Sequence, residues 1–576
     1  MEFYGNLMEN QKHLSVFATL LVERSPQALP MGAACVASAV RNSPLTKNLV
    51  QSELLTLSME DDGFCGLSDG EKAKCFAEKI LLSYPALECL CMSVYVWSKS
   101  VLEKAALILR EKKPGIRIVA GGPEITANPF GMRGIDYSVA GEGELALPEL
   151  LHSIFTASCK SIPGVYDMTA GNAPVENVPA ENEPLEKALP ADLEALSSPW
   201  LDGTIRAGDY GGALWELARG CPFKCSYCYE SKGYSKIRRF PQQRLEAELE
   251  LFAREKIPQV FVLDPTYNAD KKRALDMLKK IRRTCPDTFF YFEARAEFID
   301  AEIARAFASI NCSVQFGLQS SDPLVLKNVN RSFNKSQFKK NVSLLNEQGV
   351  VFGFDLIYGL PGDTLSGFKK SIDFALELYP NNLELFCLSV LPGTTLFEQA
   401  KGFGLVWEPE PPYHVLESPS FPKCDLLKAE KLSRAVNLFY TDGRAVPWFN
   451  SLVQVLHQKP SAFFEDFALF MEGRGAKEER PFSKLMALQK EFVAHELKSK
   501  GMQKYTALLN DIISLNGAVS RCAGEGEECQ LELSWHPDDL MSQYATDIAF
   551  FFANCGREKN TTRVFPTAKG PDWAVL

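Results

Sequence analysis

The chain has 576 residues, of which 46% are hydrophobic, and its formal net charge is −10. This length predicts several domains with sizeable cores, and the acidic balance argues against a nucleic-acid-binding surface. The first residues show no cationic segment followed by an apolar run, and no run of about 18 apolar residues occurs. We therefore expect a soluble cytoplasmic protein that has neither a signal peptide nor a membrane-spanning helix.

Residues 1–155 alternate short apolar runs with helical patterns. Glu53–Met59 and Glu88–Trp97 have the composition of strands, and Val101–Lys113 has apolar residues at helical spacing. Such alternation predicts a doubly wound, Rossmann-like domain with a parallel sheet. Residues 156–205 are rich in Pro, Ala, Glu and Asn with little periodicity, which indicates a linker.

The alternation of strands and helices resumes in residues 206–403 and produces six repeats. The strand-like segments are Ala213–Ala218, Gln259–Asp264, Phe289–Arg295, Cys312–Gln319, Val350–Gly359 and Leu383–Leu391. Six repeats predict a partial, TIM-like (β/α)6 barrel, in which chemistry is expected on the loops that follow the strands. Residues 404–576 predict a mostly helical domain with short strands in its tail, so the overall fold class is α/β.

Three cysteines, Cys221, Cys225 and Cys228, follow the first barrel strand in the segment "CPFKCSYC". Structural zinc takes four ligands, and no histidine or fourth cysteine lies nearby in the sequence. A [4Fe–4S] cluster needs one ligand on each iron, so three thiolates would leave one iron open for a substrate or cofactor. A chance cysteine cluster and a three-thiolate zinc site are the alternatives.

This Cys-x3-Cys-x2-Cys spacing, with the aromatic Tyr227 before the last cysteine, resembles the signature of the radical S-adenosylmethionine (SAM) superfamily. The resemblance implies that SAM chelates the open iron of the cluster. One electron, from a donor such as flavodoxin or ferredoxin, would then cleave SAM to methionine and a 5′-deoxyadenosyl radical. The cofactor supplies that chemistry, while the protein positions it and excludes water.

Polar residues and glycines at the ends of the barrel strands are the expected SAM contacts. Where the family usually has a Gly-Gly-Glu-type segment, this chain has "DPTYN". Asp355, inside the fifth strand, is as compatible with a structural role as with a functional one. The residues expected to contact SAM are Tyr227, Asp264, Thr266, Asn268, Glu293, Gln319, Ser320, Arg331 and Gly359.

Three segments of the first domain, "SVYVWS", "AGGPEIT" and "AGEGELALPEL", each combine a strand with a turn of small residues. Ligands of doubly wound sheets bind beyond the carboxyl ends of the strands. The set resembles the cobalamin-binding domain that precedes the barrel in many radical SAM enzymes. No Asp-x-His-x-x-Gly loop occurs, so the resemblance implies cobalamin without a protein histidine ligand, with Tyr95 or Trp97 below it. The implied contacts are Ser93, Tyr95, Trp97, Gly121, Gly122, Glu124, Gly141, Glu142 and Gly143.

The order of domains, with "PPYHVL" at Pro411–Leu416, resembles a radical SAM subgroup that has a C-terminal domain of unknown function (DUF4080-like). The resemblance implies methylation of an unactivated carbon in an unknown small-molecule or peptide substrate. Rearrangement or cyclisation without methyl transfer is one alternative. An iron–sulfur binding or electron-transfer protein without SAM turnover is another. The C-terminal helices are candidates for capping the barrel mouth and selecting the substrate.

Overall fold

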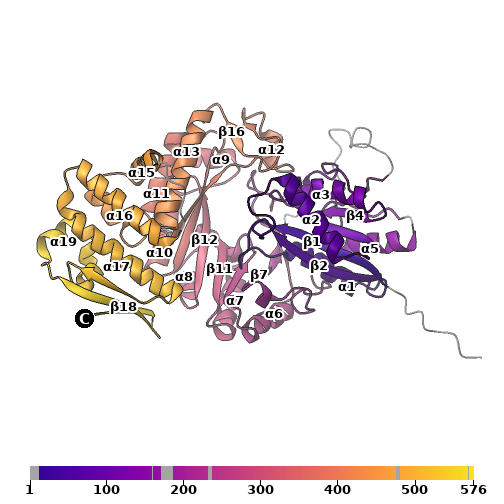
Figure 1. The fold of residues 1–576 in the computed structure, drawn as a ribbon, viewed down its shortest axis with the longest axis horizontal. Coiled ribbons are helices and arrows are strands. Elements are labelled where there is room, and N and C mark those ends of the chain that lie inside the picture. Colours follow the sequence, from indigo (N-terminus) through magenta and orange to yellow (C-terminus); the bar gives the residue numbers. More distant parts are fainter. Residues whose placement is uncertain (1–11, 159, 170–185, 231–235, 475–480, 569) are drawn as a thin grey trace, which may run out of the picture.

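The computed structural model describes residues 12–158, 160–169, 186–230, 236–474, 481–568 and 570–576. A central barrel-like sheet separates an N-terminal domain from a C-terminal group of helices, as Figure 1 shows. Within the described residues, no helix combines the length and the apolar character needed to cross a bilayer.

The N-terminal domain is built on a six-stranded sheet in the order β2-β1-β3-β4-β5-β6. Its strands are β1 (His13–Leu21), β2 (Val50–Ser58), β3 (Cys89–Ser93), β4 (Arg117–Gly121), β5 (Tyr137–Val139) and β6 (Val165–Asp167). Its helices are α1 (Met31–Asn42), α2 (Asp69–Ser83), α3 (Lys99–Lys112), α4 (Pro123–Ala127) and α5 (Gly143–Thr156). One apolar core lies between the sheet and α2 and α3, and a second lies between the sheet and α1 and α5. Helices on both faces of the sheet confirm the predicted doubly wound fold.

The segment predicted as a linker is partly built into both neighbouring domains. Strand β6 extends the first sheet by pairing antiparallel with β5, where Val165 lies opposite Val139. Farther along, Ala188 is buried in the core of the N-terminal domain, and Trp200 is buried in the core of the barrel. The sequence shows little periodicity here because single apolar residues, rather than a repeating face, make these contacts.

The barrel is an open sheet of six parallel strands in the order β14-β13-β12-β11-β10-β7, as predicted. Its strands are β7 (Ala213–Trp215), β10 (Gln259–Val262), β11 (Phe289–Ala294), β12 (Cys312–Gln319), β13 (Val351–Tyr358) and β14 (Asn382–Cys387). Its helices are α6 (Gln242–Arg254), α7 (Lys271–Thr284), α8 (Ala301–Ala308), α9 (Pro323–Asn328), α10 (Lys335–Glu347), α11 (Leu365–Leu376) and α12 (Thr395–Gln399). Two short antiparallel strands, β8 (Ala218–Arg219) and β9 (Arg238–Arg239), enclose the segment that carries the three cysteines.

The C-terminal part is mostly helical, as predicted, and its tail forms a three-stranded antiparallel sheet. Its strands are β15 (Val406–Trp407), β16 (Val415–Glu417), β17 (Cys529–Leu533), β18 (Asn560–Thr567) and β19 (Gly570–Val575). Its helices are α13 (Lys423–Val436), α14 (Phe449–Val455), α15 (Pro460–Arg474), α16 (Phe482–Ser499), α17 (Thr506–Glu525), α18 (Pro537–Leu540) and α19 (Ile548–Asn554).

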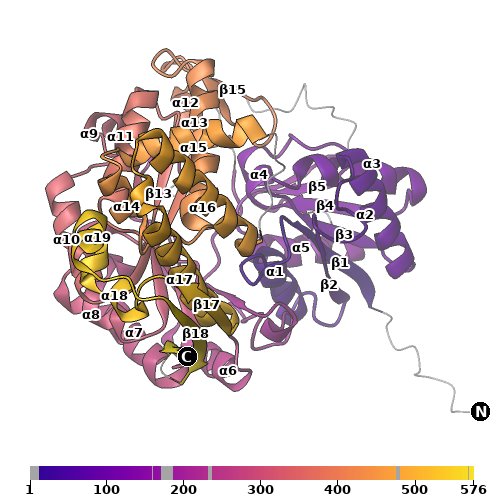
Figure 2. The same ribbon diagram turned by 60° about the vertical axis from the view of Figure 1, so that its left-hand side comes forward.

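The C-terminal helices cover the open edge of the barrel sheet. Helix α13 continues into a π-helical turn, Asn437–Thr441, that lies along β14. The Tyr440 hydroxyl donates to the Pro380 carbonyl at 2.6 Å, and the Ser433 hydroxyl donates to the Leu385 carbonyl at 2.8 Å. An uncovered edge strand is prone to pair with other chains, so this cover protects β14. In Figure 1 the helices lie on the side of the barrel away from the N-terminal domain, and in Figure 2, where this side is turned forward, they lie in front of the barrel.

Phe439 provides a test of how the C-terminal domain is held together. Its ring is fully buried, and the ring centroids of Phe463 and Phe467 each lie 5.0 Å away. We expect Phe439→Ala to lower the free energy of unfolding of this domain by roughly 3–5 kcal/mol, through lost contacts and the cavity left behind. Urea unfolding followed by tryptophan fluorescence, to which Trp448 at 5.7 Å from Phe439 contributes, measures the loss.

The matched control is Phe550→Ala, because the Phe550 side chain is 48% exposed. We expect this substitution to change the same free energy by about 0.5 kcal/mol or less. Equal effects of the two substitutions would contradict the role of Phe439 as the centre of the domain core.

Candidate functional site

The three cysteines lie on a loop that is clamped to the ends of other barrel strands. Cys225 is buried, whereas Cys221 and Cys228 are partly exposed. The Ser226 amide donates to the Val329 carbonyl at 3.0 Å, beyond β12, and the Leu396 amide, beyond β14, donates to the Ser226 carbonyl at 2.8 Å. These bonds fix the cysteine loop at the carboxyl ends of the strands, where such barrels carry out their chemistry.

The surroundings of the thiols favour a positively charged partner. Burial raises the pKa of the Cys228 thiol to about 11, and the neighbouring thiols of Cys225 and Cys221 add to the rise. A bound metal centre relieves this penalty, because its positive charge stabilises thiolates. The Arg331 guanidinium contributes charge too, since its Nη1 lies 3.9 Å from the Cys225 Sγ.

The donor set suits an iron–sulfur cluster better than a single ion. Among the residues that the structure describes, no three Cys, His, Asp or Glu side chains lie close enough together to hold one metal ion. A cubane is larger than a single ion and takes one thiolate on each iron, so its ligands stand farther apart. Three soft thiolates on one short loop match the ligand requirement of a [4Fe–4S] cluster with one iron left open, and their ligation of such a cluster stays a prediction.

Gln319 has the features of a ligand-binding residue at the end of β12. Its backbone is left-handed, with φ of +65°, and the strand register shifts between Gly317 and Gln319. The side-chain oxygen of Gln319 is buried and has no hydrogen-bond partner in the described part of the protein. Strained backbone and an unsatisfied buried polar atom are costly, and both concentrate at functional sites. Arg331 reaches the same place, where its guanidinium donates to the Gly317 carbonyl.

Two carboxylates lie on the interior face of the barrel near Gln319. Glu293 stands opposite Gln315 in the register of β11 and β12. The Gln315 side-chain amide donates to the Asp355 carboxylate at 2.7 Å. Burial raises the pKa of Asp355 to about 7. Asp355, whose role the sequence left open, thus belongs to the same interior surface as Glu293.

Two of the residues expected after the second strand, Asp264 and Asn268, are engaged in hydrogen bonds within the protein. The Asp264 carboxylate accepts from the Leu217 and Ala218 amides at 2.9 and 3.0 Å. The Asn268 side chain bonds both backbone groups of Arg295, each at 2.9 Å. Asp264 thus braces the entry to the cysteine loop, and Asn268 braces the segment after β11. Contact between these two side chains and SAM stays a prediction.

Of three further residues expected to contact SAM, one borders the cysteine loop and two make contacts within the fold. These residues are Thr266, Ser320 and Gly359. The Thr266 hydroxyl lies 3.8 Å from the Cys221 Sγ, so it borders the cysteine loop. The buried Ser320 hydroxyl accepts from the Asp322 amide at 3.1 Å. Gly359 has φ of +85°, and a Cβ there would stand 2.6 Å from the Val415 side chain. Packing of the chain therefore already requires this glycine.

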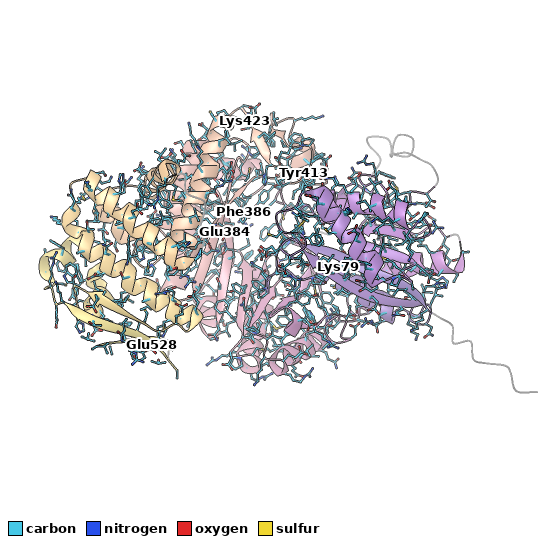
Figure 3. The ribbon with its side chains drawn as sticks, in the orientation of Figure 1. Lys79, Glu384, Phe386, Tyr413, Lys423 and Glu528 are labelled. Atoms are coloured by element: carbon cyan, nitrogen blue, oxygen red, sulfur yellow. The ribbon has the colours of Figure 1, made fainter. Side chains whose placement is uncertain are left out.

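A cavity of about 290 Å³ opens beside Tyr227, at the ends of β13 and β14. Its walls are mainly apolar, and the Phe386 side chain, labelled in Figure 3, is 50% exposed. Cavities of this kind, with few polar groups, are typical of small-molecule sites. The lining residues are Tyr227, Ile357, Phe386, Cys387, Leu388, Ser389, Leu391 and His414.

In the N-terminal domain, three small residues form a row across neighbouring strands at their carboxyl ends. Thr19 lies opposite Ser93, and Ser93 lies opposite Gly121. The Thr19 hydroxyl is buried and has no hydrogen-bond partner among the described residues. Beyond this row, the rings of Tyr95 and Trp97 stack at 4.7 Å, and Trp97 is 41% exposed. An unsatisfied hydroxyl, small neighbours and an exposed aromatic face suit a large planar cofactor such as cobalamin.

The glycines of the other predicted segments are explained by the packing of the chain itself. Gly122 has φ of +101°, and a Cβ there would stand 2.7 Å from the Val94 carbonyl oxygen. Gly141 has φ of +103°, and a Cβ there would lie 3.1 Å from the Ala188 nitrogen. A Cβ on Gly143 would lie 3.3 Å from Val36. These glycines thus have a role in folding, and their expected contact with cobalamin stays a prediction.

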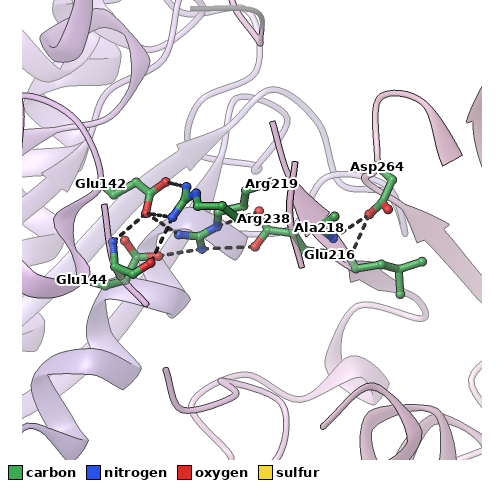
Figure 4. A network of polar contacts seen from close by, with 9 residues as sticks. Glu142, Glu144, Glu216, Ala218, Arg219, Arg238 and Asp264 are labelled. Carbon is green, nitrogen blue, oxygen red and sulfur yellow. Dashed lines mark hydrogen bonds and ion pairs between the residues drawn. The ribbon is translucent and has the colours of Figure 1, made fainter. Parts of the chain in front are cut away.

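Glu124 and Glu142, also predicted to contact cobalamin, are paired with residues outside the N-terminal domain. The Glu124 carboxylate accepts from the Tyr413 hydroxyl at 2.8 Å. Glu142 pairs with Arg219 and Arg238, as Figure 4 shows. The sequence analysis did not predict a role for the two arginines. Arg219 stands only two positions before Cys221, and this closeness to the cysteine motif could have indicated it.

Two family models match this chain. Residues 215–375 match the model described as the radical SAM superfamily, and residues 401–516 match the model described as a protein of unknown function, DUF4080. Together these matches cover the barrel except β14 and α12, and a large part of the helical region.

Curated relatives are similar over a large part of the chain. The cobalamin-dependent radical SAM methyltransferase TokK of Streptomyces tokunonensis is 28% identical over 65% of this chain and 58% of its own length. The 2-(S-pantetheinyl)-carbapenam-3-carboxylate methyltransferase of Streptantibioticus cattleyicolor is 29% identical over 58% of this chain and 51% of its own. The chain thus spans little more than half the length of these two proteins.

Among solved structures, the fold resembles that of OxsB, a cobalamin-dependent S-adenosylmethionine radical enzyme solved with aqua-cobalamin bound. The TM-score is 0.55 at 14% identity, over 95% of this chain and 85% of the other. At this identity the likeness concerns the fold, and it extends through the N-terminal domain as well as the barrel. The family models therefore show that residues 215–375 form a radical SAM domain, which is followed by a DUF4080 domain in residues 401–516.

Proposed function

We propose that this protein is a cobalamin-dependent radical SAM methyltransferase that methylates an unactivated carbon of a small-molecule or peptide substrate. The observation that carries the proposal is the meeting of two strand-end sites. The cysteine loop of the barrel lies against the strand ends of the N-terminal sheet, where the Tyr229 hydroxyl donates to the Pro123 carbonyl at 3.3 Å. The names of the curated relatives support methyl transfer.

The cofactors would divide between the two domains. Cys221, Cys225 and Cys228 would hold a [4Fe–4S] cluster, and the row at Thr19 with the aromatic pair would hold cobalamin. When bound, the cluster and SAM supply a 5′-deoxyadenosyl radical, and cobalamin supplies the methyl group. An electron donor such as flavodoxin or ferredoxin is the partner that this chemistry requires.

The residues around the cysteine loop would bind and orient SAM. The Arg331 guanidinium and the unpartnered Gln319 oxygen offer charge and a hydrogen-bond acceptor close to the thiols. Glu293 and Asp355 offer carboxylates that can accept hydrogen bonds from hydroxyl or ammonium groups. The apolar cavity beside Tyr227 would exclude water from a reactive radical.

One reconstitution experiment separates the proposed function from its alternatives. The chain is purified without oxygen, loaded with iron, sulfide and hydroxocobalamin, reduced, and given SAM with a labelled methyl group. Retained cobalamin and 5′-deoxyadenosine above background support the proposal, and methyl label in a product distinguishes transfer from rearrangement. Loss of all cobalamin would remove the methyl-transfer version, and absence of 5′-deoxyadenosine would favour a binding or electron-transfer protein.

We predict that Cys225→Ala reduces 5′-deoxyadenosine formation to background and lowers the bound iron. Each thiolate ligates one iron, so its removal leaves the cluster without a protein ligand at a second position. Iron content and the electron paramagnetic resonance spectrum of the reduced protein measure the effect. The control is Cys424→Ala, because Cys424 is exposed on α13, and we expect its iron content to equal that of the unsubstituted chain. Full iron content in Cys225→Ala would exclude this thiol as a ligand.

Asp355 predicts a pH dependence of SAM binding. Its folded pKa of about 7 lies above the usual value of a carboxyl group, so the carboxylate forms only as the pH rises through 7. Since the carboxylate is the stronger hydrogen-bond acceptor, we expect SAM to bind more tightly at pH 8 than at pH 6.

The substitution Asp355→Asn should remove this difference, as measured by calorimetry at both pH values. The control is Asp276→Asn, whose carboxyl is exposed on α7, and it should keep the difference. An unchanged pH dependence in Asp355→Asn would show that another group is responsible.

A further inference from the structure

Arg219 is buried at the junction of the two domains and binds carboxylates from both of them. Its guanidinium lies 3.0 Å from Glu216 of the barrel, 3.2 Å from Glu142 and 2.7 Å from Glu144 of the N-terminal domain. The Arg219 side chain is 14% exposed, and that of Glu144 is 6% exposed. Figure 4 shows these contacts as one network.

Arg238 makes the network rigid from the other strand of the small hairpin. It stands opposite Arg219 in the pairing of β8 with β9. Its guanidinium pairs with the Glu142 carboxylate and donates to the Ala191 carbonyl at 3.0 Å. Glu142 therefore bridges two guanidinium groups, and the planar, forked geometry of arginine fixes the orientation as well as the distance.

The network connects the two strand-end sites through short, rigid elements. Strands β8 and β9 enclose the cysteine loop, so Arg219 and Arg238 stand at its two ends. Glu142 and Glu144 stand where β5 passes into α5, at the carboxyl end of the N-terminal sheet. A second contact between the N-terminal domain and the rest of the chain, in which Tyr413 donates to Glu124, is reinforced by Lys99, whose Nζ lies 3.3 Å from the Tyr413 hydroxyl.

We propose that Arg219, Glu142 and Glu144 are positioning residues that set the separation and orientation of the cysteine loop relative to the N-terminal domain. This inference rests on the proposed function, in which each domain holds one cofactor. Methyl transfer from SAM to reduced cobalamin, which would break the sulfonium–methyl bond and release S-adenosylhomocysteine, requires both domains in the correct relative position, because reacting groups must approach within about 3–3.5 Å. Reductive cleavage of SAM requires the barrel alone.

The test uses Glu144→Gln and Arg219→Lys in the full chain. Glu144→Gln removes one charge from a buried network, and Arg219→Lys keeps the charge but removes the fork. The control is Arg239→Lys, because Arg239 lies beside Arg238 on β9 but pairs at 2.8 Å with Asp270, within the barrel.

The first measurement is amide hydrogen exchange in the protein before any cofactor is added. We expect exchange at residues 140–146 and 217–220 to quicken in both test variants and to stay unchanged in the control. Unchanged exchange in the test variants would overturn the inference whether or not the proposed function holds.

The second measurement compares two activities of the reconstituted protein with methyl-labelled SAM. In the test variants we expect 5′-deoxyadenosine formation to stay within about twofold, and label recovered with the corrinoid to fall by up to about 10²-fold, the cost of a misplacement near 1 Å. Parallel loss of both activities would mean that the network only supports the cysteine loop, and so would overturn the positioning role. Absence of both in the unsubstituted chain would instead contradict the proposed function.

Discussion

The arrangement of this protein depends on a largely buried set of charges that holds two mainly parallel sheets with their carboxyl ends toward each other. In a parallel sheet all connecting loops that bind ligands emerge at one edge, so each domain has a single functional end. Arg219 and Arg238 on one side, and Glu142 and Glu144 on the other, keep these two ends in contact. Buried charges tolerate little displacement, because a separated partner is left without compensation.

The regular parts of the fold were predictable because apolar and polar residues alternate along a strand when only one of its faces is buried. The predicted strand Cys312–Gln319 agrees with β12, where buried and partly exposed residues alternate along the whole element. The predicted strand at Glu88–Trp97 was too long, since β3 ends at Ser93 and the chain turns toward α3. Ala188 and Trp200 are single apolar residues that enter the two cores, so no periodic pattern in the sequence predicted their burial. The position of the C-terminal helices beside the barrel depends on contacts between distant residues.

The candidate site was predictable where the spacing of residues carries the chemistry and less so where distant residues pair. The three cysteines share one short loop, so their spacing alone predicted that they lie together, and the cluster that they would hold stays a prediction. The partners of Glu142 lie 77 and 96 positions away along the chain, beyond what a local motif can reveal. Gly122 and Gly141 had suggested room for a ligand, but their left-handed backbone and close neighbours show that the fold itself excludes a side chain there.

Strand β14 has one consequence for how such proteins diversify. Phe386 on this strand lines the apolar cavity. Ser433 donates a hydrogen bond to the backbone of the same strand, and Tyr440 donates one to the backbone of the turn before it. Helices of the DUF4080 domain can therefore reshape the cavity by shifting its wall, in addition to the His414 side chain that this domain contributes to the lining. Selectivity among chains of this architecture would then be encoded partly in residues remote from the reacting groups, and comparisons limited to the cavity lining would overlook them.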